Sequence, residues 1–199
     1  MKNTKVLVTY ASLTAIIFIM GFTPLGYLKV GFVEITFLTI PVIVGAILLG
    51  KSAGAFLGGI FGLTSYIQCF GMSAFGAALL SVNWFYMLIL CLVPRILMGF
   101  LCGLVFSKVK GSCRFLAASI SAPLLNTVLF TSFMILLFRN SDYISNLVST
   151  IGGNSLIKFA VAFVGINGLI EAVICAFVGS VVSAAVFKFK NSKKIQKNH

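Results

Sequence analysis

The chain is poor in acidic side chains and in the groups that most enzymes use. Its 199 residues include only 3 Asp plus Glu and 1 His, and only 9% are charged. The single histidine is the last residue, His199. With no Ser/His/Asp arrangement, no close carboxylate pair and no metal-ligand cluster, the sequence offers no catalytic set. We therefore expect neither an enzyme nor a metal or cofactor bound by this chain.

Cysteines in paired spacings are also missing. None of the five cysteines forms a CxxC pair, and most fall inside apolar runs: Cys69, Cys91, Cys102, Cys113 and Cys175. A disulfide or metal framework is therefore not predicted, and we interpret these residues as small buried hydrophobes.

What the chain has in abundance is apolar surface. Hydrophobic residues make up 60% of it, and its mean hydropathy is +1.13. A soluble chain carries about a quarter charged residues, so a water-soluble domain is excluded. Six membrane-spanning helices need roughly 120 apolar residues, close to what is present. We predict an all-α polytopic membrane protein, multi-pass in the lipid bilayer of the cell membrane, with one six-helix domain over residues 1–199 and a short basic tail at 188–199.

Six apolar runs can be traced along the chain. They cover Val6–Phe22, about Thr36–Leu49, Ala53 to roughly Cys69, Trp84–Phe106, about Cys113–Phe138, and a last run starting between Leu156 and Gly165 and ending at Phe187. The first run lacks a small-x-small cleavage site, so we expect a retained helix. The Gly/Ser-containing stretch up to Asn83 is interpreted as a loop.

The cations indicate the orientation of these helices. With the N-terminus inside, 11 of the 15 Lys and Arg residues lie on the cytoplasmic side: Lys2, Lys5, Lys51, Lys108, Lys110, Arg114, Lys188, Lys190, Lys193, Lys194 and Lys197. The positive-inside rule then predicts that both termini are cytoplasmic. No basic stripe with interleaved aromatics is present, so we expect no nucleic-acid partner.

Two outer segments are unusual. Leu25–Thr36 carries β-branched residues in rough alternation, which predicts an extended or hairpin-like lid, although an ordinary connecting loop is the alternative. Arg139–Ser155 is polar and rich in Asn, Ser and Gly. Together with the Phe70–Asn83 loop, these segments could close over one cavity on the outer face.

Polar residues within the spans are candidates for a small-molecule pocket. Inserting an arginine such as Arg95 near the centre of a membrane helix costs about 2.5–3.5 kcal/mol. Arg95 follows Pro94, which has no N–H and so leaves the Leu90 carbonyl without its helical donor. Arg95 could anchor a carboxylate or phosphate. The other candidates are Asn126, Asn167, Glu171, Gln68, Tyr66 and Asn83. The alternative is structural, with an Arg95–Glu171 salt bridge and interhelical amide hydrogen bonds.

One motif is misleading. Residues Gly45–Ser52 match the GxxxxGK[ST] phosphate-loop pattern, but that loop needs a preceding strand and free backbone amides. Here Ala-Ile-Leu-Leu ends an apolar helix, so we expect no nucleotide site.

Small residues form stripes on four of the predicted helices, and two of these are candidate partner surfaces. Ala11 and Ala15 are four residues apart on the first, and Gly54, Gly58 and Gly62 repeat the spacing on the third. Such stripes let helices approach closely in lipid. For these two helices, a partner membrane protein and packing within the chain both stay open.

The sequence resembles the substrate-binding S component of an energy-coupling factor (ECF) vitamin transporter along nearly its whole length. The resemblance is carried by Ala11–Ala15, Thr23–Gly26, Phe37–Gly45, Leu48–Gly54 and Val93–Gly99. The segment Gly62–Gly71 and the Pro94–Arg95 pair are most similar to pantothenate-type members.

The resemblance implies a vitamin-binding subunit that hydrolyses no ATP. Its implied partners are a membrane coupling subunit, contacted in part through the Ala11–Ala15 face, and two cytosolic ATPases. Pantothenate, the implied substrate, has a carboxylate for Arg95, an amide for Asn126 or Asn167, and hydroxyls for Glu171. A folate, riboflavin, pyridoxine or thiamine-precursor S component, a membrane assembly or signalling protein, and a self-sufficient facilitator are the alternatives.

Overall fold

The computed structural model describes residues 2–30, 33–111, 113–141, 145–146 and 168–195. Its named elements are α1 (Lys2–Gly21), β1 (Tyr27–Val30), β2 (Val33–Thr36), α2 (Thr39–Leu49), α3 (Lys51–Gln68), α4 (Ala74–Val82), α5 (Trp84–Lys108), α6 (Cys113–Phe138), the π-helix η1 (Cys175–Gly179) and α9 (Ser180–Ile195). Residues 168–174 are also helical and lead into η1.

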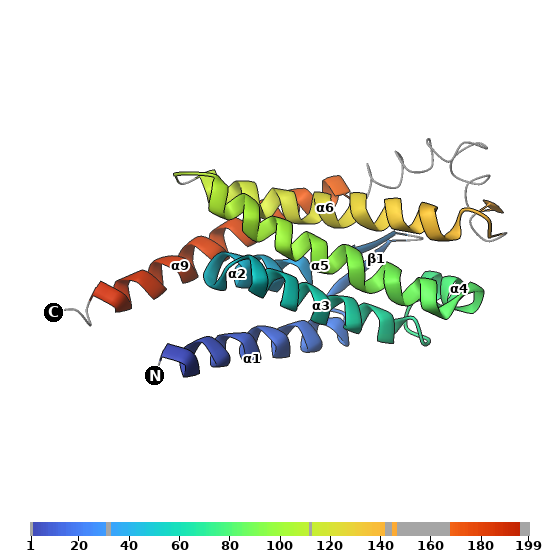
Figure 1. The fold of residues 1–199 in the computed structure, drawn as a ribbon, viewed down its shortest axis with the longest axis horizontal. Helices are drawn as coiled ribbons and strands as arrows, with labels where there is room; N and C mark the ends of the chain where they lie inside the picture. Colours follow the sequence, from blue (N-terminus) through green and yellow to red (C-terminus); the bar gives the residue numbers. More distant parts are fainter. Residues whose placement is uncertain (1, 31–32, 112, 142–144, 147–167, 196–199) are drawn as a thin grey trace.

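The helices form an elongated bundle (Figure 1). The start of α1, the α2–α3 turn, the α5–α6 connection and the end of α9 lie toward one end, while α4 lies at the other. In the described part of the chain, four helical segments are long and apolar enough to cross a membrane: Thr4–Gly21, Trp84–Lys108, Cys113–Phe138 and Gly168–Lys188. A multi-pass helical architecture is confirmed. The count of six spans and the cytoplasmic termini stay predictions.

The predicted lid is a β-hairpin. Strands β1 and β2 pair antiparallel, with Tyr27 opposite Thr36 and Val30 opposite Val33. The hairpin is followed by α2, which has only 11 residues. Several of them, including Val42 and Ile43, belong to the buried apolar core. The hairpin-like interpretation of Leu25–Thr36 is therefore confirmed over the ordinary loop.

The loop expected between Phe70 and Asn83 contains a helix instead, α4. Ser73 caps its start, because the Ser73 Oγ accepts a hydrogen bond from the Gly76 N–H at 3.1 Å. A serine before a short apolar run is a helix N-cap signal. The loop predicted for this Gly/Ser-containing stretch is therefore corrected to a capped helix. Of the other outer segment, Arg139–Ser155, most lies outside the described residues.

The glycine stripe of α3 packs inside the chain. A Cβ at Gly54 would lie 2.2 Å from the Gly99 carbonyl oxygen, and one at Gly58 or Gly62 would lie 2.1 or 2.6 Å from the carbonyl oxygen of Arg95 or Cys91. Only glycine permits this approach of α3 to α5. Because α5 covers Gly54, Gly58 and Gly62 in the described chain, the structure favours packing within the chain, one of the two alternatives that the sequence left open.

The α1 stripe has a different environment. Ala11 and Ala15 are both exposed, as are the large side chains of Leu7 and Ile19. Their assignment to a partner interface stays a prediction.

The phosphate-loop match is a coincidence in the structure as well. Gly45 is buried within α2, and a Cβ there would lie 2.1 Å from the Leu57 side chain. Residues 46–49 are helical, so their backbone amides are already engaged.

Candidate functional site

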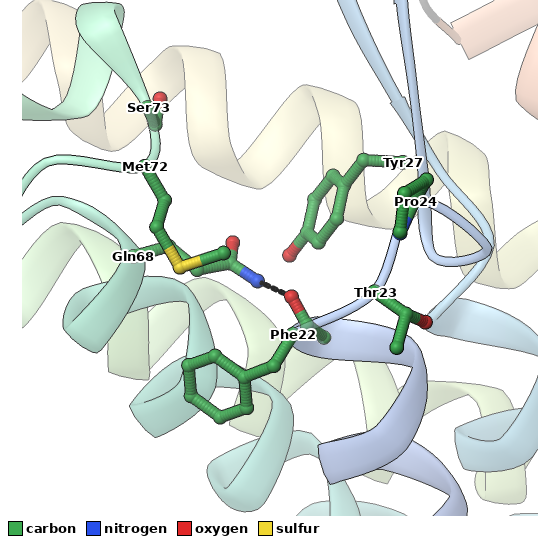
Figure 2. Close-up of a pocket in the computed structure, with 8 residues that line it drawn as sticks. Phe22, Thr23, Pro24, Tyr27, Gln68, Met72 and Ser73 are labelled. Carbon is green, nitrogen blue, oxygen red and sulfur yellow. Dashed lines mark hydrogen bonds between the residues drawn. The ribbon is translucent and has the colours of Figure 1, made fainter.

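The end of the bundle that carries the hairpin, the outer end in the predicted orientation, is hollowed. A cleft of about 410 Å³ is lined by the ends of α1 and α3, the start of the hairpin and the segment before α4: Gly21, Phe22, Thr23, Pro24, Tyr27, Gln68, Met72 and Ser73. Pockets for small molecules typically measure about 300–1,000 Å³. Figure 2 shows Tyr27 on one side of this cleft, with Gln68 and Met72 opposite.

A second, smaller cavity of about 60 Å³ lies deeper and shares three walls with the outer cleft: Tyr27, Gln68 and Ser73. It extends to Arg95 on α5 and Phe130 on α6. The two cavities together reach from the hairpin toward Arg95, near the middle of the predicted span Trp84–Phe106.

Arg95 is held by its own helix and by two aromatic rings. One terminal nitrogen, Nη1, donates to the Leu90 carbonyl oxygen at 2.9 Å. That carbonyl is free because Pro94 has no N–H to donate to it. The guanidinium carbon lies 4.5 Å from the centroid of Phe130 and 5.5 Å from that of Phe61, within the range of cation–π attraction. Arg95 is 9% exposed, and its Nε has no partner.

The sequence left a salt bridge between Arg95 and Glu171 open as the structural alternative. Among the described residues no ion pair joins these two side chains; the Glu171 Oε1 instead accepts from the Thr36 backbone N–H at 2.9 Å. The Oε2 is buried without a hydrogen-bond partner. Glu171 therefore ties the last residue of β2 to the last span and retains one free acceptor.

Asn126 lies in the same region. Its side chain acts on the Glu171 carboxylate as a side-chain hydrogen-bond partner, whereas Arg95 acts on the same group through its charge. Asn126 is buried, and its Oδ1 has no hydrogen-bond partner. A buried polar atom without a partner carries a desolvation cost, and a ligand donor could remove it.

Gln68 and Tyr27 close the space between the lid and the helices. The Gln68 Nε2 donates to the Gly21 carbonyl oxygen, joining the ends of α3 and α1 (Figure 2). The Tyr27 hydroxyl lies 3.3 Å from the Ser65 Oγ, a hydrogen bond in which either group can donate. The hairpin is thus fastened to α3 on one side and, through Glu171, to the last span on the other.

Two predicted site residues lie outside these cavities. The Asn83 Oδ1 accepts from the N–H groups of Phe85 and Tyr86 at 3.0 and 3.1 Å, so Asn83 is the N-cap of α5. Tyr66 contacts Phe70 edge-on, with ring centroids 5.4 Å apart, and it lines neither cavity. Neither residue lines the two cavities described, and their part in binding stays a prediction. Asn167 lies outside the described residues.

Sequence reasoning missed several residues that line the cavities. Tyr27, Ser65, Ser73 and Phe130 all face the deeper space. The signal for Tyr27 was its position in the predicted lid, and for Ser65 it was the spacing of one helical turn before Gln68. For Phe130 the sequence offers no signal, since one Phe among many apolar residues of a span is unremarkable.

The described site has the chemistry of a binding pocket. The two cavities offer one guanidinium, the Gln68 amide, several hydroxyls and aromatic walls. The buried Asn126 and Glu171 line neither cavity. Positive charge with planar donors suits a carboxylate or phosphate, and the remaining groups suit a ligand rich in amides and hydroxyls.

Comparison with known proteins gives the class. Residues 5–183 match the family model described as ECF transporter, substrate-specific component. The chain therefore belongs to the family of ECF transporter substrate-specific components, which are transporter subunits and not enzymes.

A more particular likeness is to the pantothenate transporter PanT of Leuconostoc mesenteroides. The two are 32% identical over 113 residues, which is 54% of this chain. The match spans 53% of the length of that relative.

Proposed function

We propose that this chain is the pantothenate-binding subunit of an ATP-driven ECF importer in the cell membrane. It captures the vitamin from outside and delivers it through a membrane coupling subunit and two cytosolic ATPases. The observation that carries the proposal is Arg95, a buried guanidinium at the bottom of an outer cavity with no acidic partner among the described residues. The family match supports the class of function, and the PanT likeness supports the substrate.

The chemistry of pantothenate fits Arg95, which lines the smaller cavity, and the buried Asn126 and Glu171, which line neither cavity. Its carboxylate suits Arg95, whose Nε has no partner in the described structure. Its amide suits Asn126, and its two hydroxyls suit the free Oε2 of Glu171. A charge-assisted hydrogen bond is roughly twice as strong as a neutral one, so the carboxylate contact dominates binding. Asn167 stays a candidate for the same amide.

The test is calorimetric titration of the detergent-purified chain with pantothenate and a panel of other vitamins. We expect pantothenate to bind and Arg95→Ala to weaken it at least about 30-fold, because truncating one partner of a buried charge pair costs about 2 kcal/mol or more. Arg139→Ala, which removes an exposed arginine beyond α6, is the matched control and should bind normally.

Three results contradict the proposal. Tight binding of a different vitamin overturns the substrate, and unchanged affinity in Arg95→Ala overturns the role of the guanidinium. Pantothenate uptake by liposomes that contain this chain alone, without an ATPase, overturns the importer mechanism in favour of a facilitator.

A further inference from the structure

A third cavity, separate from the two described above, lies at the end of the bundle away from the hairpin. It has a volume of about 690 Å³ and lies between the α2–α3 turn, the end of α5 and the start of α6. We call it the inner cleft. Its lining is of two kinds: the cations Lys51, Lys110 and Arg114, and a set of apolar or small residues, Ala46, Ile47, Gly50, Gly103, Phe106, Ser107, Val109 and Gly111.

The positive charge of the inner cleft has no acidic counterpart nearby. The sequence contains only three acidic side chains, Glu34, Asp142 and Glu171. Glu34 is in the outer hairpin, and Glu171 bonds the N–H of Thr36 at the end of that hairpin. Asp142 lies outside the described residues. Within the described part of the chain, the cleft is therefore a concentrated positive site that no acidic side chain neutralises.

Arg114 is not an ordinary surface cation. Its guanidinium carbon lies 4.9, 5.1 and 4.8 Å from the ring centroids of Phe106, Phe115 and Phe187. The three rings also contact one another. No hydrogen bond or ion pair engages Arg114 within the described chain, and its Nε is buried without a partner. Three aromatic rings thus hold the charged group at the cleft wall without neutralising it.

The position of the cleft indicates which anion fits it. It lies where the apolar α5 ends and the apolar α6 begins, and both helices are candidate membrane spans. The boundary between an apolar span and water is the level of lipid headgroups. A soluble anion would contact only the cations of the cleft. The cleft also has an apolar wall formed by Ala46, Ile47 and Phe106, which a soluble anion would not use. Charge above an apolar wall matches an amphiphile with an anionic head.

We propose that the inner cleft is a binding site for an anionic phospholipid, whose phosphate contacts Arg114 and Lys110 and whose glycerol and first acyl carbons contact the apolar wall. The site is distinct from the vitamin pocket and concerns the other end of the molecule. It does not depend on which vitamin the chain binds.

The experiment is native mass spectrometry of the full chain in detergent, with equimolar phosphatidylglycerol and phosphatidylcholine of identical acyl chains. Each cation near an anionic headgroup contributes about 1 kcal/mol, or about fivefold in affinity. We expect phosphatidylglycerol to be preferred at least about fivefold, and Arg114→Gln or Lys110→Gln to lower this preference by about that factor. Lys108→Gln is the matched control, because Lys108 is an exposed cation two residues away that does not line the cleft.

Lys110 is exposed, so Lys110→Gln carries the test if Arg114→Gln does not fold. Equal binding of the two lipids overturns the proposal, and so does an equal loss in Lys108→Gln and Lys110→Gln, which indicates general surface charge. Complete displacement of the lipid by glycerol 1-phosphate also overturns it, in favour of a soluble phosphate ligand. Absence of a lipid preference, with Lys110→Gln weakening assembly with the coupling subunit, overturns it in favour of an acidic protein partner.

Discussion

At the scale of the residue, the proline before Arg95 determines where the guanidinium lies. Pro94 leaves the Leu90 carbonyl without a helical donor, and Arg95 itself supplies the donor. In Pro94→Ala the new N–H competes for that carbonyl, and the guanidinium loses its orienting bond. We expect pantothenate binding to weaken about tenfold, which is about 1.4 kcal/mol, measured by calorimetric titration. Leu97→Ala, an outward-facing neighbour on α5, is the control, and unchanged affinity in Pro94→Ala would contradict the orienting role.

The two carboxylate oxygens of Glu171 have different surroundings, so their roles can be tested separately. The Oε1 accepts from the Thr36 N–H, and the Oε2 has no hydrogen-bond partner among the described residues. Glu171→Ala removes the acceptor for the Thr36 N–H, and a hydrogen bond to a charged group is worth about 1.5–3 kcal/mol. We expect the Thr36 amide to exchange at least about tenfold faster in hydrogen-exchange measurements on the free protein. Glu171→Gln retains an acceptor and should preserve most of the protection. If the alanine variant exchanges at the normal rate, Glu171 does not hold the lid.

At the scale of the element, the close approach of α3 and α5 depends on single glycines. A Cβ at Gly58 would lie 2.1 Å from the Arg95 carbonyl oxygen, whereas one at the adjacent Gly59 would lie 3.6 Å from its nearest neighbour, in Ile96. Overpacking of this kind costs about 1–3 kcal/mol. We expect Gly58→Ala to lower the midpoint of thermal unfolding in detergent by several degrees, and to weaken pantothenate binding because α5 carries Arg95.

Gly59→Ala is the matched control for that variant. It adds the same methyl group one residue away, in ordinary contact, and removes the conformational cost of a helical glycine. Its unfolding midpoint should stay the same or rise. An equal decrease in both variants would show that the tight contact at Gly58 is not what limits the helix separation.

The helices that consist of one long apolar run were predicted correctly from the sequence. The predicted run Cys113–Phe138 coincides with α6, and Trp84–Phe106 differs from α5 by two residues at one end. Helix α4 was missed because nine residues containing a glycine are too short for periodicity to separate from a loop. The glycine stripe was recognised, but its partner was not. In lipid, both a neighbouring helix and another protein are apolar surroundings, so spacing alone does not tell them apart.

At the scale of the whole molecule, the site could be predicted only in part. Arg95 was identifiable because a charge within an apolar span is costly and therefore rare. Tyr27 and Ser65 carried weaker signals and Phe130 none, because the hairpin and two helices bring them together only in the folded chain. Asn83 shows the ambiguity of such signals, since a polar residue at the start of a span can also be a helix cap.

The exposed face of α1 leads to the last prediction, which concerns assembly. Ala11 and Ala15 are exposed, as is Ala185 on α9, so tryptophan at any of these positions is accommodated outside the core. If the small-residue face of α1 docks against the coupling subunit, Ala11→Trp and Ala15→Trp should prevent co-purification with the coupling and ATPase subunits. Pantothenate binding should be unchanged, because neither alanine lines the cavities. Ala185→Trp makes the same substitution on another exposed helix face and should assemble normally. Normal assembly of both α1 variants would mean that this face contacts only lipid. Loss of assembly in Ala185→Trp as well would mean that a bulky side chain anywhere on the bundle surface prevents assembly.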